Sequence, residues 1–248
     1  MITVQIQPEY KMGEEYLALS ENMGCFFEVL ELAFPNYGKD LPDWYKKSGR
    51  ARSLHGAFID INVASNEPEI ARVSKARCEE SCEIARYVGA ENVVFHSSCY
   101  PLLRGGYLVE WAKRCAEFYT YLSGKHGLSV FIENSFDLDP SPLCELMKNV
   151  NGADVSVCLD IGHVALSRAP LADWTGALGE NIKYMHLSDN NGLFDDHNPL
   201  GSGVADVYGA SDFYLSHLDI PLTLEVGGMN GIKASMEFIE KNKLFGVR

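Results

Sequence analysis

Short apolar segments alternate with longer segments of helical periodicity along the whole chain. The apolar segments are rich in Val, Ile and Phe and are bounded by Gly, Pro, Asn or Ser, which is typical of β-strands. Several are apolar at consecutive positions, which favours parallel strands buried on both faces. The predicted strands are Ile2–Ile6, Cys25–Leu32, Ser53–Ile59, Asn92–His96, Ser129–Glu133, Val155–Asp160, Ile182–Leu187 and Pro221–Val226.

The segments between these strands carry apolar residues every three or four positions among charged ones, the period of an amphipathic helix. The clearest covers Glu69–Val88 and is followed by Gly89, a residue suited to ending a helix. The other predicted helices are Gly13–Met23, Asp40–Lys47, Leu108–Leu122, Pro142–Asn149, Leu171–Leu178, Ser211–His217 and Ala234–Asn242.

The order of these elements predicts the fold. The 248 residues divide into eight strand–helix units of about 31 residues, which is the pattern of a (β/α)8 barrel. An open, doubly wound sheet is the alternative, but the Gly-rich turn that usually follows its first strand is missing. No linker or shift in composition divides the chain. We therefore predict an α/β fold, a single (β/α)8 TIM barrel over residues 1–248.

The composition narrows the class of protein further. Hydrophobic residues make up 46% and charged residues 22%, as in ordinary globular domains, and no apolar run reaches the ~20 residues of a membrane span. We expect a cytoplasmic protein, because the N-terminus lacks a signal-peptide pattern and the seven scattered Cys form no CxxC pairs. The formal net charge of −13 argues against a broad nucleic-acid surface, since phosphate contacts need Lys and Arg.

Histidines and carboxylates gather at the C-terminal ends of the predicted strands, which in a barrel converge on one mouth. Glu133 and Glu225 follow apolar segments, where burial without a partner is costly for a carboxylate. A bound cation removes that cost, and mixed His and carboxylate ligands suit Zn, Mn, Fe or Co better than Ca or Mg. The residues at these ends are His55, His96, Glu133, Asp160, His163, His186, Asp195, His197 and Glu225.

The segment Asp160-Ile-Gly-His163 is informative by itself. A carboxylate at a strand end is followed by a Gly, which permits a tight turn, and then by an imidazole. We expect this turn to aim both groups at neighbouring points of one metal site.

Six segments also carry a resemblance to a known family: LHGAFIDIN, VVFHSS, VFIEN, VCLDIGH, YMHLSDNNGLFDDHNPLGSG and LTLEV. In this order they resemble the xylose isomerase-like (β/α)8 barrel superfamily over essentially the whole chain. That superfamily contains sugar isomerases and epimerases and also the endonuclease IV class of apurinic-site nucleases. The resemblance therefore implies a metal-dependent enzyme of one of these two branches.

The two branches differ in the metal site that the resemblance implies. In the isomerase and epimerase branch one divalent ion is held at four positions, and two glutamates among them also act as acid and base. In the nuclease branch three zinc ions are held at nine positions, so the expected number of ions is one to three. The four positions match Glu133, Asp160, His186 and Glu225, and the nine add His55, His96, His163, Asp195 and His197.

Two features favour the isomerase and epimerase branch. The segment HLSDNNGLFDDHNPLGSG resembles its members more than it resembles the nuclease. The predicted mouth loops also carry more acidic than basic residues, whereas a bent DNA duplex needs several phosphate contacts. The basic residues are Lys11, Lys39, Arg104, Arg168 and Lys233, and the acidic ones are Glu67, Asp137, Asp139, Asp189, Asp195, Asp196 and Asp206.

We therefore predict a metal-dependent isomerase or epimerase of a small sugar or sugar-derived ketone, in which Glu133 and Glu225 move a proton next to a metal-chelated carbonyl. The candidate substrate contacts are His163, Arg104 and Arg168, and an arginine can grip a phosphate group with two hydrogen bonds. An apurinic-site phosphodiesterase with three zinc ions is the alternative, and a non-catalytic metal-binding barrel is a third hypothesis. The resemblance also suggests a homodimer formed through outer helices.

Overall fold

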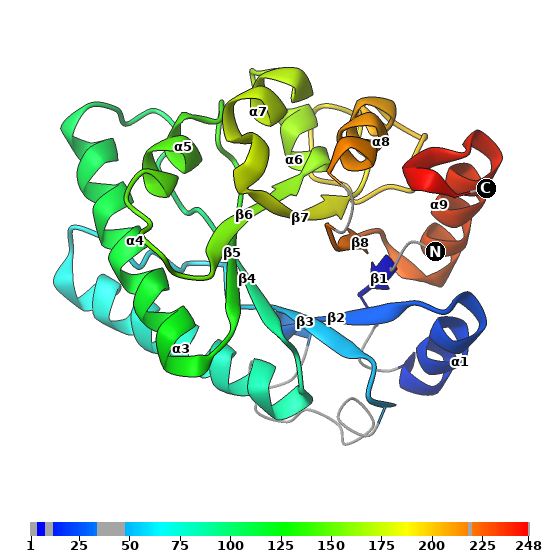
Figure 1. Ribbon diagram of the computed structural model, residues 1–248, viewed down its shortest axis with the longest axis horizontal. Helices are drawn as coiled ribbons and strands as arrows, with labels where there is room; N and C mark the ends of the chain where they lie inside the picture. The colour runs from blue at the N-terminus through cyan, green and yellow to red at the C-terminus, as the bar shows by residue number, and fades with distance from the viewer. Residues whose placement is uncertain (1–3, 8–11, 34–47, 218–219, 248) are drawn as a thin grey trace.

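The computed structural model describes residues 4–7, 12–33, 48–217 and 220–247. Within them, eight parallel strands form a closed barrel in sequence order, and the last strand pairs with the first. Figure 1 shows the strands at the centre and the helices around them. The predicted α/β fold, a (β/α)8 barrel, is confirmed. The predicted helix Asp40–Lys47 and the mouth residues Lys11 and Lys39 lie outside the described residues.

The strands agree closely with the hydrophobic pattern. The prediction for the third strand was shifted, because the strand starts two residues earlier and ends at His55 instead of Ile59. The chain leaves the barrel after His55 and turns at Asp60, which has a φ of 60°. The strands are β1 (Val4–Ile6), β2 (Phe26–Leu30), β3 (Ala51–His55), β4 (Asn92–His96), β5 (Ser129–Glu133), β6 (Val155–Asp160), β7 (Ile182–Leu187) and β8 (Leu222–Leu224).

One described helix was not predicted. It is α6 (Ile161–Leu166), which follows β6 directly and is too short to show helical periodicity. The other helices are α1 (Gly13–Met23), α3 (Pro68–Val88), α4 (Gly106–His126), α5 (Ser141–Met147), α7 (Leu171–Leu178), α8 (Val207–Ser216) and α9 (Gly228–Asn242), with 3-10 turns η2 (Glu31–Ala33), η3 (Gly179–Asn181) and η4 (Leu244–Gly246).

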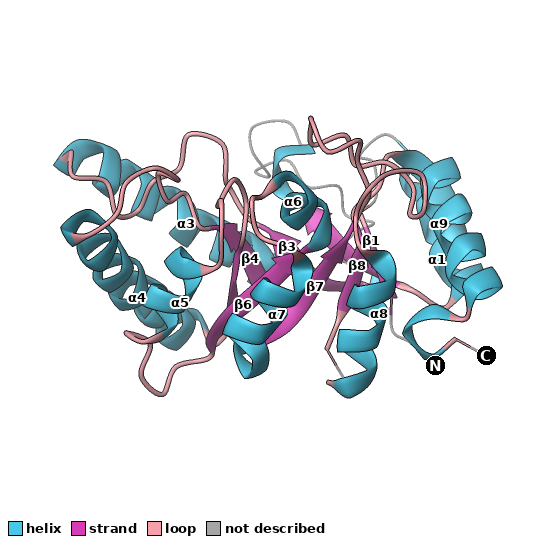
Figure 2. Cartoon of the chain, turned by 90° about the horizontal axis from the view of Figure 1, so that it is seen from above, coloured by secondary structure: helices cyan, strands magenta, loops and turns pink. Residues whose placement is uncertain are grey.

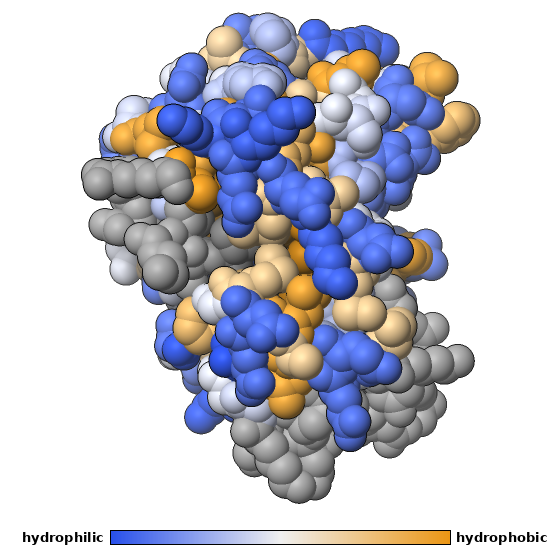
Figure 3. All heavy atoms as spheres, turned by 90° about the vertical axis from the view of Figure 1, so that its right-hand side faces the viewer, coloured by the Kyte–Doolittle hydropathy of each residue, from blue (hydrophilic) through white to orange (hydrophobic). Residues whose placement is uncertain are grey.

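The main apolar core lies between the barrel and the helices that flank it. Figure 2 shows these helices beside the strands, seen from above. Helix α4 illustrates the pattern, because Trp111, Cys115, Tyr119 and Leu122 share one face and are all buried. On the side of α1 and α9, hydrophilic residues gather in several areas with apolar residues exposed between them (Figure 3). Among the described helices, none combines the length and the apolar character that crossing a membrane requires.

The barrel interior is divided into an apolar and a polar part. Val94, Phe131, Cys158 and the ring of Tyr184 form a small apolar cluster. The hydroxyl of Tyr184 instead belongs to a hydrogen-bonded group, which we call the polar floor. The polar floor consists of Gln5, Ser53, Tyr184 and Thr223.

Candidate metal centre

Four of the predicted ligand residues meet at the C-terminal end of the barrel. Glu133, Asp160 and His186 end strands β5, β6 and β7, and Glu225 follows β8. All four are buried, and each offers one ligand atom within 4.8 Å of the ligand atoms of the other three. We call this group the four-residue set. Its members come from neighbouring strands, so the barrel itself fixes their arrangement.

Each member of the four-residue set has one buried polar atom without a hydrogen-bond partner among the described residues: Glu133 Oε1, Asp160 Oδ2, His186 Nδ1 and Glu225 Oε2. These atoms face one another. His186 Nδ1 lies 2.8 Å from Glu225 Oε2, 3.4 Å from Glu133 Oε1 and 3.9 Å from Asp160 Oδ2. Burial of such atoms without partners is costly. A divalent cation would satisfy all four at once, so these residues fit a metal ion.

The pKa shifts of the four-residue set also point to a charged centre. Burial alone would raise the pKa of Glu133 and Glu225, but the neighbouring histidines, His186 foremost, together outweigh it and lower both. Burial raises the pKa of Asp160 to about 6. Burial would lower the pKa of His186, yet the surrounding acidic groups raise it well above its ordinary value.

A second group of possible ligands shares Glu133. His55 Nε2 lies 3.2 Å and His96 Nε2 lies 3.5 Å from Glu133 Oε2. The carboxylate of Glu133 thus turns Oε1 to the four-residue set and Oε2 to the two histidines. Burial lowers the pKa of His96 to about 3, which keeps its imidazole in the neutral form that binds metals.

A third group lies beside the four-residue set. His163 Nε2 and His197 Nε2 lie 3.1 Å and 3.3 Å from Asp195 Oδ2. Their other ring nitrogens are held by backbone, since His163 Nδ1 is 2.8 Å from Asn134 O and His197 Nδ1 is 2.8 Å from Glu225 O. Burial would lower the pKa of His197, but Asp195, Glu225 and Asp160 together outweigh it and raise this pKa to about 10. The structure therefore brings all nine predicted ligand positions together at the mouth.

A buried carboxylate shapes the loop that carries Asp195 and His197. Asp189 accepts hydrogen bonds from the backbone N–H groups of Gly201 at 3.0 Å and Gly203 at 2.8 Å. It also accepts from Asn190 and Ala205, both at 2.9 Å. The segment 190–205 is thus folded around one side chain, which sets where its ligand residues lie.

The segment from Asp160 to His163 differs from the predicted tight turn. It is the first turn of helix α6, in which Asp160 is the N-cap and accepts a hydrogen bond from the backbone N–H of His163 at 2.8 Å. Gly162 has no positive φ. It is needed instead for close packing, because a Cβ atom there would collide with Ser188 Oγ.

The predicted substrate contacts are less closely organised than the ligands. Arg104 is bound to Asp139, with Nη2 3.0 Å from Oδ2, and Arg168 is exposed. Lys233, predicted in a mouth loop, lies on helix α9 instead, because this helix begins at Gly228. Roles in substrate binding for the two arginines stay predictions.

Aromatic rings flank the histidines. Phe58 stacks on His96 with ring centroids 4.4 Å apart, and the ring centroids of Phe136 and His163 are 5.9 Å apart. Trp111, by contrast, is buried in the core.

Three of the acidic residues predicted in the mouth accept hydrogen bonds from backbone N–H groups. Glu67 and Asp206 accept hydrogen bonds from backbone N–H groups at the starts of helices α3 and α8, and Asp189 organises the loop described above. These hydrogen bonds fix where the three carboxylates lie, and each carboxylate keeps its negative charge.

The sequence pattern did not reveal Glu28 on strand β2. This residue is fully buried, and its Oε2 lies 3.1 Å from His186 Nε2. The predicted ligands stand at strand ends, whereas Glu28 stands in the middle of the strand FFEVL. A carboxylate within such an apolar strand was the available signal, since burial of a charge demands partners.

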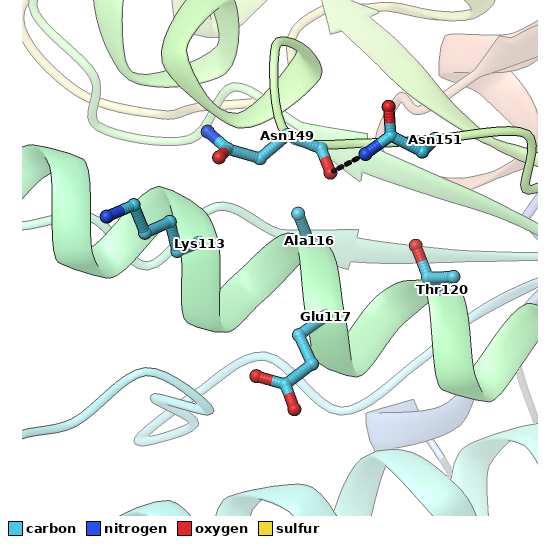
Figure 4. A pocket seen from close by; sticks show the side chains of 6 residues that line it. All are labelled: Lys113, Ala116, Glu117, Thr120, Asn149 and Asn151. Carbon is cyan, nitrogen blue, oxygen red and sulfur yellow. Dashed lines mark hydrogen bonds between the residues drawn. The ribbon is translucent and has the colours of Figure 1, made fainter.

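A hollow of about 290 Å³ on the outer surface has no comparable chemistry. It lies between α4 and the loop before β6 (Figure 4), where Glu117 points away from Asn149 and Asn151. None of the nine ligand positions lines it.

Comparisons with known proteins agree with this architecture. A family model described as "Xylose isomerase-like TIM barrel" matches residues 26–242. The uncharacterized protein MJ1311 of Methanocaldococcus jannaschii is 26% identical over 163 residues, covering 60% of this chain and 55% of that protein. The chain thus spans little more than half the length of this curated relative.

Solved structures share the fold over almost the whole chain. The TTHB071 protein from Thermus thermophilus, soaked with ZnCl2, has a TM-score of 0.79 and 23% identity and covers 97% of both chains. A D-tagatose 3-epimerase-like protein has a TM-score of 0.79 and 19% identity, covering 97% of this chain and 96% of its own.

Proposed function

Because the chain belongs to the xylose isomerase-like TIM barrel family, we propose that it is a divalent-metal-dependent isomerase or epimerase of a small sugar or sugar-derived ketone. The observation that carries the proposal is the four-residue set, in which two buried glutamates face one point together with Asp160 and His186. The likeness to a D-tagatose 3-epimerase-like protein supports the same reaction class. Zinc and manganese are the ions that the mixed His and carboxylate ligands favour.

The proposed chemistry divides between the ion and the two glutamates. A cation bound by the four-residue set would polarise a substrate carbonyl and acidify the adjacent C–H bond. A carboxylate beside a bound cation is held in its ionised form, so Glu133 and Glu225 would both be able to accept a proton. One glutamate would take the proton, and the other, or a water, would return it. Return of the proton to the opposite face of the same carbon gives an epimer. Return of the proton to the neighbouring carbon gives an isomer.

Other residues of the mouth would orient the substrate. His163 is held through Nδ1 by Asn134 O, so its Nε2 is directed towards the mouth side, where Asp195 lies. We assign it a contact with a substrate hydroxyl. The rings of Phe58 and Phe136, packed beside His96 and His163, would exclude water from one side of the reacting carbon.

The test is exchange of substrate protons with solvent. Metal-loaded protein is incubated with a panel of ketoses and aldoses in D2O, and deuterium next to the carbonyl is followed by NMR. We expect Glu225→Gln to slow the exchange at least about 100-fold, because it removes a proton-transfer group. The matched control is Asp196→Asn, which removes one exposed carboxylate from the same mouth.

Circular dichroism and metal analysis of both variants show whether fold and metal content are retained. Full exchange activity in a metal-loaded Glu225→Gln protein would contradict the assignment.

One observation favours a second candidate function, a three-metal phosphodiesterase acting at apurinic sites in DNA. All nine ligand positions are brought together, and Glu133 faces two groups at once. Several ions would activate a water and stabilise the leaving oxygen. The two candidates are separated by the number of zinc ions retained after dialysis and by nicking of a duplex with one abasic site. Three retained ions with nicking that Glu225→Gln abolishes would favour the phosphodiesterase.

A further inference from the structure

We propose that Glu28 is a positioning residue of the metal centre, which orients His186 directly and Glu225 through Gln7. The inference rests on the proposed metal centre but not on any particular substrate. None of the nine ligand positions predicted from the sequence includes Glu28 or Gln7, and neither residue belongs to the four-residue set.

The first argument is the geometry of His186. Its Nδ1 faces the other members of the four-residue set, and its Nε2 lies 3.1 Å from Glu28 Oε2. A ring nitrogen that binds a cation carries no proton, so the proton of a neutral imidazole must then reside on Nε2. Nε2–H donates to the Glu28 carboxylate, which fixes both the tautomer and the ring orientation.

The second argument is the link from Glu28 to Glu225. The side-chain amide of Gln7 donates from Nε2 to Glu28 Oε1 at 2.9 Å and to Glu225 Oε1 at 2.8 Å. Because Oε1 of Glu225 is held in this way, its Oε2 is left facing the centre without a hydrogen bond. One carboxylate and one amide therefore orient two of the four ligands.

The third argument is that Glu28 is itself held rigidly. It is fully buried, and the Tyr184 hydroxyl of the polar floor donates to its Oε2 at 2.7 Å. Gln5 Nε2 donates to that hydroxyl at 2.8 Å, and Ser53 Oγ donates to Gln5 Oε1 at 2.8 Å. The chain of donors and acceptors runs from the barrel interior up to the metal ligand, so the ligand orientation is set before an ion arrives.

Glu31 offers a matched control. It is equally buried and follows β2 in the turn η2, but its carboxylate is bound by Arg77 and Ser81 of helix α3. Glu31→Gln therefore removes a buried charge near the same strand and leaves the contacts of His186 unchanged. A role of Glu28 in folding alone would make the two variants equivalent in metal binding.

The experiment measures zinc affinity by competition with a chromophoric chelator, using the metal-stripped full chain. We expect Glu28→Gln to weaken zinc binding about 10- to 100-fold. The introduced amide has one acceptor oxygen where the carboxylate has two, so it cannot accept from both Gln7 and His186. Glu31→Gln should stay within about threefold of the wild type, although it too lowers the melting temperature.

An NMR measurement distinguishes a positioning role of Glu28 from a role in stability alone. In the zinc-loaded protein, the His186 Nε2–H proton should be observed by NMR and should shift or exchange faster in Glu28→Gln. If Glu28→Gln fails to fold, Tyr184→Phe and Gln7→Ala test the same connections, with a smaller expected loss of zinc affinity.

Equal zinc affinity in wild type and Glu28→Gln, or an equal loss in Glu31→Gln, would overturn the inference. Absence of zinc binding by the wild type would overturn the metal centre and this inference together. Zinc binding without sugar exchange would contradict only the proposed reaction, because the affinity measurement does not use a substrate.

Discussion

At the scale of single residues, most charged groups of the mouth lie against partners. The carboxylate of Asp137 is an exception. Asp137 is buried on the loop after β5, and Ser97 Oγ donates to its Oδ2 at 2.7 Å. Its Oδ1 has no hydrogen-bond partner among the described residues. Burial consequently raises its pKa to about 6.

This shift predicts a pH-dependent effect on stability. The native state holds the Asp137 proton up to about pH 6, whereas the unfolded chain releases it near its ordinary value of 3.8. The stabilisation is complete below pH 3.8 and is lost as the pH rises through 6. Between pH 5 and pH 8 the free energy of unfolding of the wild type should fall by about 1–1.5 kcal/mol more than that of Asp137→Asn. Urea unfolding of both metal-free proteins checks this, and parallel pH profiles would contradict it.

At the scale of elements, the short helix α6 connects packing to the ligand set. Gly162 on this helix touches Ser188, and a Cβ atom would also come within 3.1 Å of Asp160 Oδ1. The helix therefore sits as close to β7 as a backbone without a side chain allows.

We expect Gly162→Ala to destabilise the protein by about 1–3 kcal/mol through overpacking. It should also weaken metal binding, because Asp160 must move. The control is Gly176→Ala on helix α7, where a Cβ atom meets nothing within 4 Å. That change should stabilise by about 0.5–1 kcal/mol. Thermal unfolding and zinc titration of both variants test the contrast, and similar effects at the two glycines would refute it.

The same elements show what the sequence could and could not predict. Strands β4, β5, β6 and β7 have the predicted bounds, because their apolar runs are buried on both sides. Helix α6 was not predicted because its six residues are too few to show helical periodicity. Its Gly162 was predicted to permit a tight turn, whereas it allows close packing against Ser188. Glu28 is marked locally only as a carboxylate within an apolar strand, and its role was missed because its partner His186 lies 158 positions away in the sequence.

At the scale of the whole molecule, a bound ion should stabilise the barrel. An ion that binds only the folded chain adds about 2.7 kcal/mol to the free energy of unfolding when its free concentration is 100 times its dissociation constant. For a chain of this length, this corresponds to a rise in melting temperature of about 5–10 °C. Scanning calorimetry with zinc, before and after chelation, measures it. Magnesium should have a smaller effect, because His ligands do not suit it, and an equal effect would contradict the ligand assignment.

The hydrogen bond between Gln7 and Glu225 has a consequence for how the chain reaches its native state. It joins residues 218 positions apart at the seam between β1 and β8, where three described residues of each strand pair. Contacts of such separation form late, because a long loop must be closed before they bring any gain. The orientation of Glu225 is therefore completed only when the barrel closes. On the proposed metal binding, only the closed barrel would hold the ion with high affinity, and partly folded chains would compete poorly for it.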